Sequence, residues 1–190
     1  MSGEPRNATV TYPGGLRARW RWGGSGQEAA VFALAEVGGA ILDLGTRVAE
    51  DPSPLCRAEL RVEGPRGSWT DRFASTISDD PRAFAWDTAD LLVVSYGFHT
   101  FGLATATGEA AWEHRSATPI IALLGSSRLA HVLVQAELET FAIDPDGTVA
   151  WRIAHSDVVT AAELVGGHLV LTGYEGQHNA VDPATGRTAS

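Results

Sequence analysis

The sequence predicts an all-β protein built from about four similar units. Gly108, Gly147 and Gly186 follow one another at intervals of 39 residues, and the same interval separates Trp112 from Trp151. Each unit reads as an apolar run, a polar tip, an alternating run, a glycine turn and a short run toward tryptophan. Four strands in about 39 residues match the size of a β-propeller blade. We therefore expect a small β-propeller of about four four-stranded blades.

The second unit shows how each strand is predicted. The segment FAWDTAD supplies a first strand and a turn, residues 91–94 a second strand, TFGLAT a third, and AAW the start of a fourth. The turn TATGE between the last two contains a glycine, which readily adopts the positive φ that tight hairpins need. The third and fourth units repeat this order with IIALLGSS and VVTAAELVGG as first strands.

The chain is predicted to form one domain over residues 1–190, with units near 28–77, 79–115, 118–154 and 157–190. In the first unit, AAVFALAEVGG, AILDLG, RAELRV and GSWTDRF are the expected strands, and residues 46–56 lengthen the loop between the second and the third. Phe73 lies 39 residues before Trp112, so we expect it to take the place of the tryptophan.

The fourth unit ends before its last strand, and an open ring leaves unpaired strand edges. We expect the N-terminal residues 9–22 to supply that strand and close the last blade. In GLRARWRW the alternation places Leu16, Ala18, Trp20 and Trp22 on one face and three arginines on the other, as in a half-buried strand. The alternative is that the chain is half of an eight-bladed ring completed by a dimer, so the protein is a monomer or a homodimer.

The pattern A-(I/V)-D-P-x-T-G-x-x-x-W, seen over residues 142–151 and 181–186, resembles the PQQ-like, or quinoprotein-type, β-propeller repeat. The resemblance covers residues 79–190 well and the first 78 residues poorly. It implies a propeller fold in a superfamily that contains quinone-dependent dehydrogenases and also cofactor-free scaffolds that bind proteins. The sequence has no vicinal cysteine pair, no lysine and no evident acidic calcium cluster. We therefore expect no cofactor and no metal.

The composition narrows the classes of partner. All 14 basic residues are arginine, against 23 acidic residues and a net charge of -9. This charge repels phosphate backbones, so nucleic acid is not an expected partner. No long apolar run or signal-peptide pattern is visible, so no membrane association is expected. One cysteine, Cys56, fits a reducing compartment, and we expect a bacterial, cytoplasmic protein.

Candidate site residues gather on one predicted face. The loops between second and third strands, and those between units, lie on the same face of a propeller, opposite the tight turns. Rigidly held loops commonly carry function. The ligand-binding candidates there are Tyr96, Phe98, His99, Glu137, Tyr174 and His178. In the sharpest version, His99, His178 and Glu137 form a metal or acid/base group at the central opening, against the simpler interpretation of ordinary exposed loop residues.

Two functions follow from this face. The first is a cytosolic, non-enzymatic scaffold that binds a protein or a small-molecule ligand through the long-loop face. The second is an enzyme with a pocket at the central opening of that face, in a pathway such as bacterial secondary metabolism. No catalytic residue is identified, and a propeller fold by itself does not choose between the two.

Overall fold

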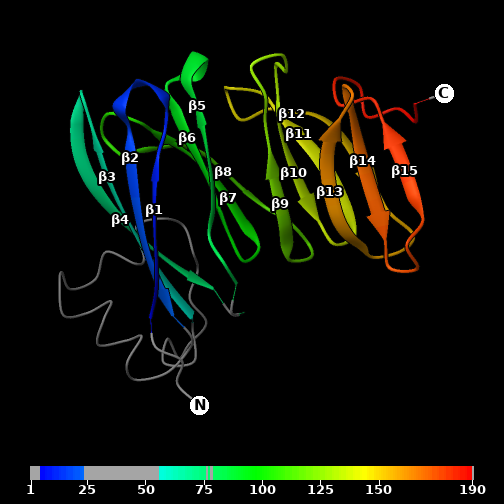
Figure 1. The fold of residues 1–190 in the computed structure, drawn as a ribbon, viewed down its shortest axis with the longest axis horizontal. Coiled ribbons are helices and arrows are strands. Elements are labelled where there is room, and N and C mark those ends of the chain that lie inside the picture. The colour runs from blue at the N-terminus through cyan, green and yellow to red at the C-terminus, as the bar shows by residue number, and fades with distance from the viewer. Residues whose placement is uncertain (1–4, 24–55, 76, 78, 190) are drawn as a thin grey trace.

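The computed structural model describes residues 5–23, 56–75, 77 and 79–189. Fifteen strands form four antiparallel sheets that follow one another along the chain as an open arc (Figure 1). The first sheet contains β1 (Arg6–Thr11), β2 (Arg17–Gly23), β3 (Cys56–Gly64) and β4 (Gly67–Ser75). The second contains β5 (Arg82–Trp86), β6 (Leu91–Tyr96), β7 (His99–Ala104) and β8 (Ala110–Arg115).

The third sheet contains β9 (Ile120–Leu124), β10 (Val132–Ala136), β11 (Glu139–Ile143) and β12 (Val149–Ala154). The fourth contains β13 (Val159–Val165), β14 (His168–Gly173) and β15 (His178–Val181), and its last strand is reduced to a single bridge between Val181 and Thr188. The prediction of an all-β chain with four repeated sheets is confirmed, whereas the predicted closure of the arc is not seen. The extent of the domain stays a prediction.

The predicted place of the strand GLRARWRW is wrong. Residues 17–23 form β2, which pairs with β1 and β3 inside the first sheet and not with the fourth sheet. The alternation is as expected, because Ala18 and Trp20 are buried and the intervening arginines are exposed. Alternation identifies the buried face of a strand but not its neighbour. Here a turn at residues 13–15, with two glycines at positive φ, pairs β2 with the strand directly before it.

Two of the four strands predicted for the first unit are described. RAELRV lies in β3 and GSWTDRF in β4, as expected. The other two, AAVFALAEVGG and AILDLG, lie outside the described residues, as does the insertion apart from Cys56. The described first sheet is completed by β1 and β2, which take the first and second positions.

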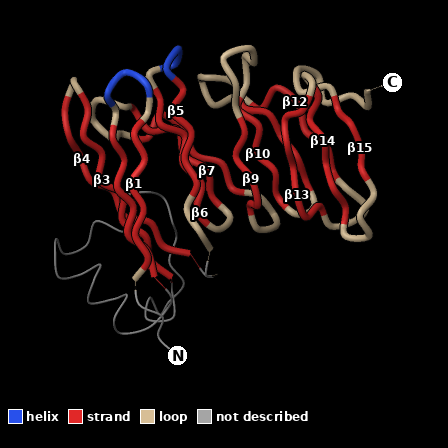
Figure 2. The backbone as a smooth tube through the Cα atoms, viewed as in Figure 1, coloured by secondary structure: helices blue, strands red, loops and turns tan. Residues whose placement is uncertain are grey.

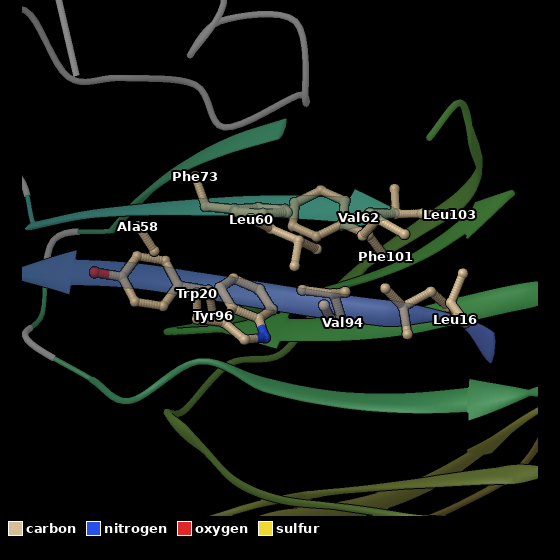
Figure 3. Packing of buried hydrophobic residues seen from close by; sticks show 12 residues of the cluster. Leu16, Trp20, Ala58, Leu60, Val62, Phe73, Val94, Tyr96, Phe101 and Leu103 are labelled. Carbon is tan, nitrogen blue, oxygen red and sulfur yellow. The ribbon is translucent and has the colours of Figure 1, made fainter. Parts of the chain in front are cut away.

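Apolar side chains fill the spaces between neighbouring sheets, so the core lies in layers. Between the first and second sheets, Trp20 contacts Phe73, which in turn contacts Phe101 of β7, with ring centroids 5.8 and 5.5 Å apart (Figure 3). The middle strands β6 and β10 are buried along their whole length, because sheets cover both of their faces. Strand β14 alternates between buried and more exposed residues, as expected for a sheet covered on one face.

A repeated tryptophan contact joins each sheet to the next. The indole N–H groups of Trp69, Trp112 and Trp151 donate hydrogen bonds to the carbonyls of Thr105, Pro145 and Pro183, over 3.0, 3.1 and 3.1 Å. The indole rings lie against the turn glycines Gly108, Gly147 and Gly186, where an added Cβ would approach the ring to within 2.7, 2.5 and 2.6 Å. Trp69, and not Phe73, therefore occupies the tryptophan position in the first sheet. The 39-residue glycine interval is the sequence trace of this contact.

Candidate functional site

All described connections between second and third strands, and those between sheets, lie at one end of the arc (Figure 2). We call this end the loop face. It contains residues 97–98, 116–119, 137–138, 155–158 and 174–177. The opposite end carries the tight turns, including residues 87–90 and 144–148. This sorting matches the sequence prediction, and each of the six candidate residues lies on or next to a hairpin of the loop face.

The six candidates belong to three hairpins that are equivalent in successive sheets. Tyr96, Phe98 and His99 lie on the β6–β7 hairpin, Glu137 on the β10–β11 hairpin, and Tyr174 and His178 on the β14–β15 hairpin. The structure brings Tyr96 and His99 together as a cross-strand pair. Tyr96 is buried, whereas Tyr174 is 76% exposed. Burial makes Tyr96 a core residue, and Tyr174 is the candidate most available to a partner.

The titratable candidates make their contacts within their own sheets. His99 Nδ1 lies 2.8 Å from Glu113 Oε1, and the imidazole stacks on Phe101. His178 Nδ1 lies 3.1 Å from the Thr172 hydroxyl. Among the residues that the structure describes, no three His, Cys, Asp or Glu side chains lie close enough to hold a metal ion. His99, His178 and Glu137 are therefore not joined in the group that the sharpest hypothesis required.

Backbone hydrogen bonds hold the hairpin tips in place. In the second sheet, the tip carbonyls of Gly97 and Phe98 accept hydrogen bonds from Ile120 and Ser116, both over 2.9 Å. In the third sheet, Glu137 and Leu138 accept them in the same way from Val159 and His155, both over 2.8 Å. Each tip is thus bonded to the connection that leaves its own sheet. The loop face therefore presents its tips on a rigid frame.

Apolar residues occupy these tips, with acidic residues close by. Phe98 is half-buried, Leu138 is 39% exposed and Tyr174 is 76% exposed, so exposure increases from the second sheet to the fourth. Glu137 and Glu175 are the sequence neighbours of Leu138 and Tyr174. The sequence prediction included Phe98 and Tyr174 but missed Leu138, which aligns with Phe98 once the hairpins are superimposed.

His155, at the connection between the third and fourth sheets, belongs to a small polar network. Its Nε2 lies 2.6 Å from the Thr140 hydroxyl, which also bonds to the side chain of Gln135. Burial lowers the pKa of His155 below its usual value of 6.5, because the charged imidazolium loses solvation. This histidine is therefore neutral at pH 7.

A cavity of about 270 Å³ lies between the third and fourth sheets. Its lining includes His155, Asp157, Leu171, Gln177 and Asn179. A wider cleft of about 370 Å³ lies between the first and second sheets on the tight-turn side, where Pro13, Leu16 and Arg66 line it. The sequence interpretation treated that side as turns alone and did not identify either space.

Arg66 is the most polar feature of the wider cleft. Its guanidinium donates to Asp90 Oδ1 over 2.6 Å and to the Thr105 hydroxyl over 2.7 Å. The hydrogen bond and the charge of Arg66 lower the pKa of the Asp90 carboxyl below its usual range. Because this arginine is already paired with a carboxylate, it offers little attraction to an anionic ligand.

Comparisons with known proteins support the architecture. No protein-family model and no curated protein sequence matches the chain. Among solved structures, BamB from Moraxella catarrhalis is similar with a TM-score of 0.52 and 18% identity, over 70% of this chain and 48% of that chain. HIRA(644-1017) gives 0.53 and 14%, over 100% and 53%, and the computationally designed Ika8 protein gives 0.52 and 13%, over 75% and 46%.

The chain has a β-propeller-type fold. It spans about half the length of each of these structures. At such low identities the likeness concerns the fold alone, and the finer assignment to PQQ-like repeats is a proposal supported by the sequence pattern. No described helix is long and apolar enough to cross a membrane.

Proposed function

We propose that this chain is a propeller-type scaffold that binds a protein partner through the loop face. The observation that carries the proposal is the series of apolar tips on three equivalent, rigidly bonded hairpins, ending in the exposed ring of Tyr174. Exposed aromatic residues on preorganised loops are typical binding anchors, since a rigid surface loses little entropy on association.

The charges near the tips indicate the chemistry of the partner. Glu137, Asp157 and Glu175 lie on the loop face, and the chain as a whole carries a net charge of -9. A partner surface with apolar residues flanked by basic ones fits this arrangement, because opposite charges favour association and like charges oppose it. A cytoplasmic location is part of the proposal and is supported by the single cysteine. The enzyme alternative has no assembled group of titratable residues to support it within the described part of the chain.

The test compares two surface variants in quantitative cross-linking capture from cells of the source organism. A double variant, Leu138→Ala with Tyr174→Ala, removes the exposed tips without touching the core. Loss of an aromatic anchor costs about 2 kcal/mol, or roughly thirtyfold in Kd. We expect a partner that the unmodified chain captures to be lost by this double variant.

Val165→Ala is the matched control, because Val165 is 53% exposed but lies at the tight-turn end of β13. It should retain the partner. Equal capture by the double variant and the unmodified chain, or equal loss in the control, would contradict a role for the loop face.

A further inference from the structure

The cavity between the third and fourth sheets occurs where the repeat changes its residue. In β7 and β11 the same register position holds Phe101 and Phe141, which are 1% and 0% exposed. In β15 this position holds Asn179, which is exposed and lines the cavity. Phe101 and Phe141 fill the spaces toward the preceding sheets by packing on Phe73 and His114. The shorter Asn179 leaves the corresponding space open.

The walls of this cavity combine apolar and polar groups. Ile153, Val159, Leu171 and Val181 provide apolar surface. Asn179 contributes a side-chain amide that makes no hydrogen bond to any described residue. Such a mixture of apolar walls and a few polar groups is typical of ligand sites, and the volume lies just below the usual range of about 300–1,000 Å³.

Asp157 sets the charge of the cavity. Among the described lining residues it is the acidic one, and no arginine lines the space. Its Oδ1 accepts a hydrogen bond from the Val158 amide over 2.7 Å, and its Oδ2 accepts one from Gln177 Nε2 over 3.0 Å. Each carboxylate oxygen can accept a second hydrogen bond. The fixed carboxylate therefore offers a site for a positively charged donor.

We infer that this cavity binds a small organic cation, with its ammonium group on Asp157 and its apolar body against Leu171 and Val159. The Asn179 amide is placed to bond a polar group of the same ligand. The site lies between two sheets, apart from the hairpin tips proposed to bind protein, and does not depend on that proposal. Its size excludes ligands as large as a dinucleotide.

The experiment titrates the full chain with benzylamine, using benzyl alcohol as the uncharged comparison of similar shape, and follows backbone amide chemical shifts at pH 7. We expect saturable shifts around Asp157 and Asn179 with benzylamine and at least tenfold weaker binding of benzyl alcohol, since about 1.4 kcal/mol of charge-assisted bonding is a factor of ten. No saturable shift with benzylamine, or equal binding of both probes, would overturn the inference.

Variants separate the parts of the site. Asn179→Phe restores the residue of the other repeats and should abolish benzylamine binding, while Asn179→Leu, with a smaller side chain, should weaken it. Asp157→Asn should weaken binding about tenfold through loss of the charge. Glu163→Gln changes an exposed carboxylate on the same sheet and should have no effect.

Unchanged binding in Asn179→Phe would contradict the site. The Leu138→Ala, Tyr174→Ala double variant should bind benzylamine normally, so failure of the cation site and failure of the loop-face proposal are distinguishable.

Discussion

The space between the second and third sheets and the space between the third and fourth use the same frame but are filled differently. Both carry the tryptophan contact, from Trp112 in one case and from Trp151 in the other. In the first space Phe141 completes the packing, whereas in the second Asn179 leaves a cavity. The comparison teaches that the tryptophan contact holds neighbouring sheets together, while the register position of Phe141 decides whether the space between them is core or pocket.

The largest expected effect comes from breaking the tryptophan contact. Gly147 has a φ of 88°, and an added Cβ would lie 2.5 Å from Trp112. Gly147→Ala should therefore lower the free energy of unfolding by about 3 kcal/mol, from the left-handed backbone and the overpacking together. Urea unfolding measures this change.

Gly166 provides the matched control. It also has a positive φ, of 59°, but nothing lies within 4 Å of its added Cβ. Gly166→Ala should cost only about 1–2 kcal/mol, from the backbone alone. Equal losses in the two variants would show that the contact of the glycine with the indole ring does not matter.

A smaller effect concerns pH and the polar edge of the cavity. Burial lowers the pKa of His155, so the unfolded chain binds its proton more readily than the folded chain. Stability should therefore fall as the pH drops below about 6.5, through the folded pKa. In His155→Gln this part of the loss should disappear, which is seen by comparing Tm values at pH 7.5 and 5.5.

Asp71 provides an internal reference in that experiment. Burial raises its pKa to about 6, so its contribution to stability is lost as the pH rises and opposes that of His155. Because Asp71 is present in both proteins, it cancels in the difference between their Tm shifts. Parallel pH dependence in the two proteins would contradict the role given to His155.

Much of the fold could be predicted because each sheet repeats a local pattern. The apolar runs, the glycine turns and the face on which the loops lie all depend on neighbours close in sequence. The pairing of β2 could not be predicted in this way, because alternation is the same whether the strand lies in the first or the fourth sheet. Position 73 was misassigned for a similar reason, since a fixed interval ignores the different lengths of the strands.

The candidate site was predictable in part. The sequence identified the loop face and Tyr174, but it could not show that Tyr96 is buried or that His99 pairs with Glu113. The cavity did leave a signal, because the aligned segments HTFGLA and ETFAID carry phenylalanine where QHNAVD carries asparagine. Its meaning required the knowledge that this position faces the preceding sheet.

The central claim is that this one position decides between core and pocket, and exchanging the residues tests it most directly. The measurement is the free energy of unfolding of Phe141→Asn and of Asn179→Phe against the unmodified chain. Phe141→Asn should lose about 4 kcal/mol through a cavity and a buried amide, whereas Asn179→Phe should be neutral or gain about 1 kcal/mol. A loss of similar size in both variants would contradict the claim, because it would show that the space beside Asn179 cannot accept the phenylalanine of the other repeats.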